Sequence, residues 1–182
     1  MSIVSDIEKL KKEKNAVILA HYYVDEDVQD IADYIGDSFY LSKVATKIDQ
    51  DRIIFAGVEF MGESAKILNP DKRVFMPDMN ADCPMAHMAD KDEILKLREE
   101  YDDLAVVCYI NSTAELKKYS DVCVTSSNAV KIVKNLPNKN IFFIPDRNLG
   151  HFVAKQCPDK NFIFNNGCCP RHVVITKDMV LK

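Results

Sequence analysis

The chain has 182 residues, 47% of them hydrophobic, and its 24 Lys and Arg against 28 Asp and Glu give a formal net charge of −4. This is an ordinary globular composition without a basic patch, so nucleic acid is not an expected partner. The beginning of the chain has no apolar signal core, and no apolar run is long enough to cross a membrane. We therefore expect a cytoplasmic protein with no membrane partner, in which six cysteines are reduced, bind a metal or take part in redox chemistry.

Short apolar segments rich in Val, Ile and Phe alternate along the chain with amphipathic ones. The apolar segments predict strands at 16–23, 52–58, 73–76, 105–110, 122–125, 140–144 and 161–164. Between them, helical spacing predicts helices at 3–10, 28–35, 62–68, 92–100, 113–119, 128–136 and 148–156. Continuously apolar strands that alternate with helices are typical of parallel sheets in an α/β fold.

Two stretches of the chain resemble two others. Residues 7–21 resemble 94–109 at an offset of 87 or 88, and residues 65–78 resemble 130–146 at an offset of 68 near the end. An internal repeat of this length predicts two related units, with the second copy shorter in its middle. We expect two homologous three-layer αβα units with short parallel sheets of three strands each, pseudo-symmetric, at residues 1–88 and 89–182.

Polar side chains follow several of the predicted strands. Ligands bind outside the carboxyl ends of the strands in parallel α/β units, so these residues are the first candidates for a site. They are His21, Tyr22, Tyr23, Glu63, Lys66, Tyr109, Asn111, Ser112, Thr125, Ser126, Ser127 and Asn128. Such a rim suits a small oxygenated acid or a phosphate ester, and residues 126–128 also open a helix, where backbone N–H groups favour anions.

Several candidate residues also have a purely structural interpretation. His21 after a buried strand can be a hydrogen-bonded structural histidine. Residues 126–128 fit an ordinary helix N-cap, and 36–38 fit a helix end followed by a new cap. Tyr23 and Tyr109 can be core residues with hydrogen-bonded hydroxyls.

Two cysteines, Cys83 and Cys169, each follow a predicted strand. Thiols offered on loops, in a chain without signs of export, indicate metal or cluster ligands rather than a disulfide. A second interpretation combines them with His87 and His172 in a Cys2His2 zinc site.

The other cysteines differ in their sequence context. Cys108 and Cys123 lie inside predicted strands, so we expect inert thiols buried in the core. Cys168 directly precedes Cys169, and position alone does not decide which of the two is a ligand.

Taken together, these stretches resemble the quinolinate synthase family of NAD biosynthesis. The resemblance covers essentially the whole chain, and the similar segments occur in the family's order. They are 18–23 (ILAHYY), 28–38 (VQDIADYIGDS), 55–68 (FAGVEFMGESAKIL), 83–86 (CPMA), 109–115 (YINSTAE), 124–129 (VTSSNA) and 145–149 (PDRNL).

The resemblance implies an enzyme built from three homologous αβα units around a pseudo-threefold axis, of which this chain matches the first two. It implies a [4Fe–4S] cluster on the axis, held by one cysteine per unit, with one open iron acting as a Lewis acid. The reaction condenses iminoaspartate with dihydroxyacetone phosphate to quinolinate and releases phosphate and two waters. L-Aspartate oxidase or aspartate dehydrogenase would supply the imine.

The same resemblance implies roles for individual residues. Cys83 and Cys169 are the metal ligands, and Cys169 is preferred to Cys168 because Gly167, Cys169 and His172 match the family pattern Gly-x-Cys-x-x-His. The implied catalytic residues are Tyr23, His21 and Tyr109. The implied substrate-binding residues are His21, Ser38, Tyr109, Asn111, Ser126 and His172.

Two other functions stay open on the sequence. One is a binding or scaffold relative without turnover, and the other is a zinc-binding structural protein. Because the third unit and its cysteine are absent from the 182 residues, we also expect this chain to be inactive alone.

Overall fold

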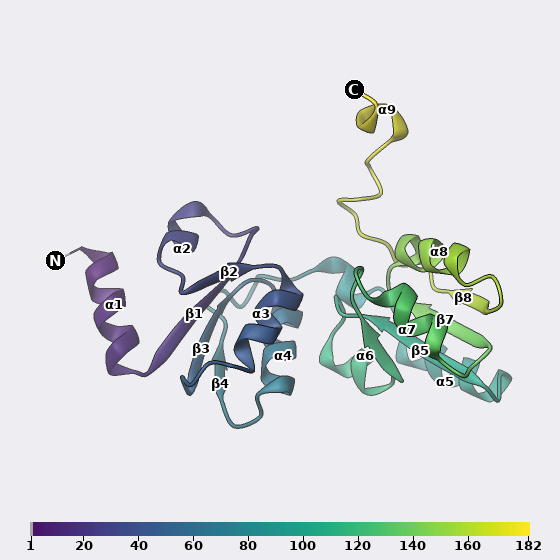
Figure 1. Cartoon of the computed structure of the whole chain (residues 1–182), viewed down its shortest axis with the longest axis horizontal. Helices are drawn as coiled ribbons and strands as arrows, with labels where there is room; N and C mark the ends of the chain where they lie inside the picture. The colour runs from purple at the N-terminus through teal and green to yellow at the C-terminus, as the bar shows by residue number, and fades with distance from the viewer. Residues whose placement is uncertain (1) are drawn as a thin grey trace. The chain divides into compact units, whose positions relative to one another are not determined.

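The fold is described for residues 2–182 of a computed structural model. The chain divides into two compact units, one ending at Asp82 and the other beginning at Cys83, slightly before the boundary that the repeat predicts. Each unit holds a four-stranded parallel sheet with flanking helices (Figure 1). The predicted α/β class, with two αβα units and short parallel sheets, is confirmed.

The first sheet has the strand order β2-β1-β3-β4. Its strands are β1 (Ala16–His21), β2 (Tyr34–Gly36), β3 (Arg52–Ala56) and β4 (Arg73–Phe75). The helices of this unit are α1 (Ile3–Glu13), α2 (Glu26–Asp30), α3 (Ser38–Ala45) and α4 (Glu59–Leu68).

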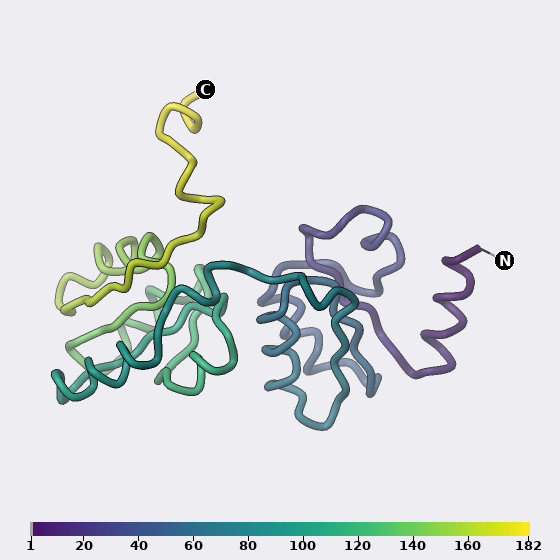
Figure 2. The backbone as a smooth tube through the Cα atoms, turned by 180° about the vertical axis from the view of Figure 1, so that it is seen from behind, coloured from purple at the N-terminus to yellow at the C-terminus, as the bar shows by residue number. Residues whose placement is uncertain are grey.

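The second sheet has the matching order β6-β5-β7-β8. Its strands are β5 (Leu104–Tyr109), β6 (Val122–Val124), β7 (Asn140–Ile144) and β8 (Asn161–Phe164). The helices are η1 (Pro84–His87), α5 (Lys91–Glu100), α6 (Ala114–Lys118), α7 (Ala129–Asn135), α8 (Arg147–Gln156) and α9 (Lys177–Val180). Residues 170–182, the yellow end of the backbone in Figure 2, are all exposed.

The prediction of three strands per unit and of a helix over 28–35 is wrong. Helix α2 stops at Asp30, and residues 34–36 form β2 beside β1. Asp33 explains the change, because its backbone N–H donates to the Ile18 carbonyl at 2.9 Å and its carboxylate accepts the Ile18 N–H at 2.8 Å. These two bonds fix the chain against β1, where an extended conformation follows.

The predicted alignment at an offset of 68 is also wrong. It matched β4 to β7, whereas the sheet orders make β4 equivalent to β8 and β3 equivalent to β7. Both β4 and β7 are apolar strands that lead into Pro-Asp, at 77–78 and 145–146, so the likeness is local. The second copy is therefore not shortened in its middle.

The second unit buries apolar side chains on both faces of its sheet. On one face α7 and α8 pack against Phe143, and Val153 of α8 is fully buried there. On the other face Leu116 of α6 and Ile94 of α5 pack with Phe142. Since successive residues of a strand point to opposite faces, Phe142 and Phe143 serve the two layers separately.

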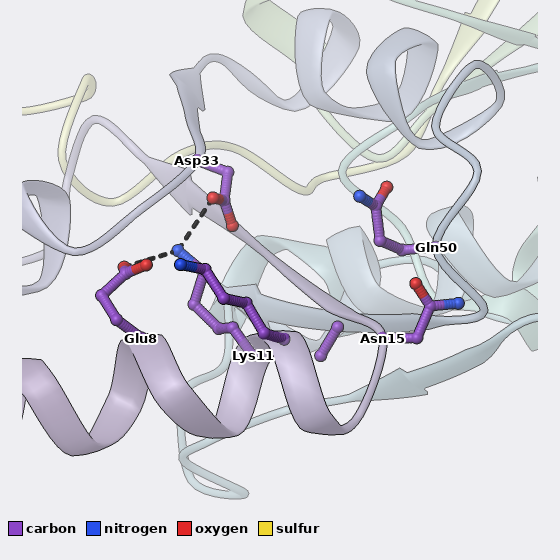
Figure 3. A pocket seen from close by; sticks show the side chains of 7 residues that line it. Glu8, Lys11, Asn15, Asp33 and Gln50 are labelled. Atoms are coloured by element: carbon purple, nitrogen blue, oxygen red, sulfur yellow. Dashed lines mark hydrogen bonds and ion pairs between the residues drawn. The ribbon is translucent and has the colours of Figure 1, made fainter.

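A partly buried ion pair ties the first helix to the first sheet. Lys11 of α1 lies 2.8 Å from both Glu8 and Asp33 (Figure 3). Asp33 also accepts the Ile18 N–H. These side chains line a polar cavity of about 320 Å³ near the amino ends of the strands. Ligands of parallel sheets bind at the carboxyl ends, so this cavity is at the edge opposite to the expected site.

The second unit repeats the arrangement. Arg98 of α5 contacts the Asp121 carboxylate at 2.9 Å and the Tyr119 carbonyl at 3.0 Å, and Asp121 accepts the Val106 N–H at 2.7 Å. We call Lys11–Asp33 and Arg98–Asp121 the edge clamps. Their recurrence in both units assigns them to the fold rather than to a ligand site.

Replacing a clamp carboxylate should destabilise its own unit. We expect Asp33→Ala to lower the free energy of unfolding by about 1–2 kcal/mol, because a strand N–H loses its acceptor. Asp33→Asn, which keeps an acceptor oxygen, should lose less. Urea unfolding followed by circular dichroism measures both, and an Asp33→Ala variant as stable as the parent would contradict the assignment.

Candidate functional site

The carboxyl edge of the first sheet gathers His21 and Ser38. His21 ends β1 and is paired in register with Gly36, the last residue of β2. The Tyr22 N–H extends this pairing by donating to the Gly36 carbonyl at 3.2 Å. Asp37 caps α3 by accepting the Tyr40 N–H, which makes Ser38 the first residue of that helix. The pairing of β1 with β2 therefore places two of the predicted substrate-binding residues on one edge.

His21 is held as a neutral hydrogen-bond donor. Its side chain is buried, with 6% of its surface exposed, and its Nδ1 accepts the Tyr23 backbone N–H at 3.2 Å. Burial lowers the pKa of His21, while the Asp37 carboxylate opposes the shift. With Nδ1 engaged as an acceptor, the proton of the neutral ring lies on Nε2. Tyr23 contacts the imidazole edge-to-face at 4.5 Å and is itself 89% exposed.

The electrostatics of His21 give a prediction. We expect the imidazole to titrate below its ordinary value of 6.5, and Asp37→Asn to lower the pKa further, because it removes the nearby charge and keeps a capping oxygen. The stability contributed by neutral His21 is then complete above pH 6.5 and is lost as the pH falls toward the lowered value. Two-dimensional NMR of the imidazole nitrogens measures the titration, with Tyr23→Phe as control because it keeps the backbone N–H. Titration above 6.5 would contradict the prediction.

The carboxyl edge of the second sheet gathers Tyr109, Asn111 and Ser126. Tyr109 ends β5 opposite Val124 of β6, and the Ile110 N–H donates to the Val124 carbonyl at 2.8 Å. Asn111 is partly exposed just after β5, and Ser126 is exposed two residues after β6. These are the positions that the sequence predicts for them in the α/β framework.

Most polar groups of the loop after β6 hold the loop itself. The Thr125 N–H donates to Asn128 Oδ1 at 2.7 Å, and the Thr125 and Ser127 hydroxyls lie 2.9 Å apart. Asn128 is the N-cap residue of α7, but its side chain makes no bond to the helix. Contacts within the loop, rather than the N-terminus of the seven-residue helix α7, therefore define this part of the edge.

Two loops that carry the predicted ligand cysteines are joined to each other. Cys83 precedes the short helix η1, and Met88 follows it. The Asn165 amide, just after β8, donates to the Met88 carbonyl at 2.8 Å. Gly167 also lies close to Met88, because a Cβ atom added at Gly167 would be 2.9 Å from the Met88 Cβ. The segment leading to Cys169 therefore runs beside the helical turn that begins at Cys83.

The second thiol loop turns immediately after its cysteines. The N–H groups of His172 and Val173 donate to the Cys169 carbonyl at 3.1 and 3.0 Å. His172 lies within the exposed segment 170–182, whereas Cys168 and Cys169 are both partly exposed. Burial does not separate the two cysteines, so the preference for Cys169 stays a prediction.

The thiols on these loops suit a soft metal or a cluster. Cys83 and Cys169 are reduced and partly exposed, as thiolate ligation requires. Within residues 2–182, no three His, Cys, Asp or Glu side chains gather as they would around a metal ion. The described residues therefore do not form the four-ligand zinc site built from the two Cys-His pairs. They offer two thiols, a set that fits part of an iron–sulfur ligand shell.

The prediction that both strand cysteines of β5 and β6 are buried is wrong for one of them. Cys108 is fully buried, whereas Cys123 is exposed. The reason is that β6 is an edge strand of the sheet, so a side chain on it is covered from one side only.

Each αβα unit has a parallel sheet with polar or thiol side chains after the carboxyl ends of its strands, which is where α/β proteins commonly bind ligands. A family model described as "Quinolinate synthetase A protein" matches residues 5–182. The chain therefore belongs to the quinolinate synthase family.

Curated relatives show how much of a family member is present. The quinolinate synthase of Fusobacterium nucleatum is 62% identical over 176 residues, which are 97% of this chain and 59% of that protein. That of Clostridium perfringens is 54% identical over 182 residues, 100% of this chain and 60% of the relative. That of Clostridioides difficile is 52% identical over 176 residues, 97% and 58% respectively. The chain thus spans about three-fifths of the length of these relatives.

No helix among residues 2–182 is both long and apolar enough to span a membrane.

Proposed function

We propose that this chain supplies the first two units of a quinolinate synthase, which condenses iminoaspartate with dihydroxyacetone phosphate in NAD biosynthesis. The observation that most supports this proposal is the Asn165–Met88 hydrogen bond, which joins the Cys83 loop to the Cys169 loop in a chain of this family. A bond that holds two thiol loops together is what a shared cluster would need. L-Aspartate oxidase or aspartate dehydrogenase is the proposed source of the imine.

Cys83 and Cys169 would hold a [4Fe–4S] cluster together with a third cysteine from outside the 182 residues. When bound, the cluster supplies a Lewis-acidic iron with an open coordination position. A shell of two cysteines is incomplete, so the proposal assigns turnover to the assembled three-unit protein.

The edge residues would bind the substrates and handle protons. His21 donates a hydrogen bond through Nε2 to a carboxylate, carbonyl or phosphate oxygen, because its ring is neutral and Nδ1 is occupied. Tyr23 and Tyr109 are the proposed proton donors and acceptors for the imine–enamine and dehydration steps. Ser38, Asn111, Ser126 and His172 supply further hydrogen bonds to anionic groups.

Complementation tests the proposal. We expect the isolated chain, reconstituted anaerobically with iron and sulfide, to form no quinolinate, and to gain activity when the remaining C-terminal part of the F. nucleatum relative is added. Quinolinate is measured by chromatography, and bound iron and sulfide are measured in parallel. An assembled protein with about four irons per chain and no turnover would favour a binding or scaffold role, and bound zinc would favour a structural one. Full turnover by the chain alone would show that the third unit is not needed.

A further inference from the structure

Cys108 and Cys123 face each other across neighbouring strands. They are register partners in the parallel pair of β5 and β6. Neighbouring strands lie about 4.8 Å apart, which falls within the Cα separation of about 4.4–6.8 Å that disulfides span. Their environments differ, because Cys108 has no exposed surface while Cys123 is open on the edge strand.

Polar groups surround the buried thiol of this pair. Cys108 Sγ lies 3.4 Å from the Tyr109 carbonyl oxygen. A hydrogen bond with Cys123 is the largest influence on the buried thiol and outweighs its desolvation, and Ser112, Ser120 and the Lys117 charge act in the same direction. Together they lower the pKa of Cys108 to about 7, while the same pairing raises the pKa of Cys123. One proton therefore leaves the pair easily, and the other is held.

We propose that Cys108 and Cys123 form a redox-active dithiol that closes to an intramolecular disulfide by exchange with a small-molecule disulfide. The proposal rests on the register pairing and on the contrast between one exposed and one buried thiol. It is independent of the proposed enzymatic function, since neither cysteine belongs to the thiol loops or to the strand-edge residues assigned above.

The exchange proceeds in two balanced steps. The exposed Cys123 sulfur attacks the external disulfide while the Cys108 thiolate accepts its proton as a general base, so that a mixed disulfide forms and one thiolate is expelled. Cys108 then loses its proton to water and attacks the Cys123 sulfur, which forms the internal bond and expels the second thiolate. The two protein thiols are oxidised, and one external disulfide is reduced to two thiols.

Peptide mapping tests the proposal on the whole chain. The protein is treated with glutathione disulfide, blocked with N-ethylmaleimide and digested with trypsin without reduction. Cys108 lies alone in peptide 99–117 and Cys123 alone in peptide 119–131, so a link between them has a unique mass. We expect the linked peptide pair in the parent protein, with the mass of two hydrogens lost.

Three variants and one control variant separate the proposal from nonspecific oxidation. In Cys108→Ser the link is lost and glutathione stays on Cys123, whereas in Cys123→Ser the link is lost and the buried Cys108 stays unmodified. Cys108→Ala, with circular dichroism to verify folding, should behave as Cys108→Ser does. Cys157→Ser is the matched control, because Cys157 is also buried but has no cysteine register partner, and the link should persist. Persistent glutathione on Cys123 in the parent protein, or two unreacted peptides, would overturn the proposal.

Discussion

Replacing Cys83 or Cys169 with alanine should abolish quinolinate formation by the complemented three-unit protein. Each change removes one thiolate of the proposed cluster, and a cluster left with fewer protein ligands is poorly held. We expect the iron content and the visible absorption of the cluster to fall with the activity. Both variants should remain folded, because each of these thiols is only partly buried.

Two further variants serve as controls for the cluster assignment. Tyr23→Phe should keep the iron content and lose ring closure, since it removes an exposed phenol and no ligand. Cys168→Ala should keep both the iron content and ring closure, because Cys169 carries the proposed ligand role. If Cys168→Ala loses the cluster and Cys169→Ala keeps it, the assignment within the pair is reversed.

A methyl group at Gly167 should destabilise the second unit by about 3 kcal/mol, near the upper end of the usual cost of overpacking. A Cβ there would lie 2.3 Å from the Pro145 carbonyl oxygen and 2.9 Å from the Met88 Cβ. A backbone oxygen cannot move aside as a flexible side chain does, so the loop bearing Cys169 must shift. Urea unfolding measures the loss, and faster alkylation of Cys169 would report the shift.

Gly62→Ala is a matched control for this prediction. Its Cβ would also meet a close neighbour, Met76 Sδ at 2.4 Å, but that atom is the end of a flexible side chain. Gly62 lies within α4, where alanine is the better helix former by about 1 kcal/mol. Stability should therefore be kept or raised, and an equal loss in both variants would show that crowding alone decides the outcome.

The alternation of apolar and amphipathic segments was sufficient to predict the α/β class, because strands buried in a parallel sheet have continuous apolar sequences. It was not sufficient for β2, which has three residues and a single buried one. That strand depends on the bonds of Asp33 to Ile18, a contact between segments with no signal in the local pattern.

The candidate site could also be predicted from the sequence only in part. His21 and Tyr109 could be placed at sheet edges from the sequence, since both directly end apolar strands. The bond between Asn165 and Met88 could not, because its partners are 77 residues apart and an asparagine gives no sign of its partner. The exposure of Cys123 was missed for a related reason, because an isolated strand pattern does not reveal which strand ends the sheet.

The edge clamps and the candidate site residues lie at opposite ends of the same strands. Lys11–Asp33 and Arg98–Asp121 hold the amino ends, and His21 and Tyr109 stand at the carboxyl ends. The clamps and the residues proposed to recognise ligands are thus separated along the length of the strands. Protein engineers could raise the thermal tolerance of each unit by redesigning its clamp, for example with arginine in place of Lys11 as the second unit already has, while leaving the chemistry of the other end intact.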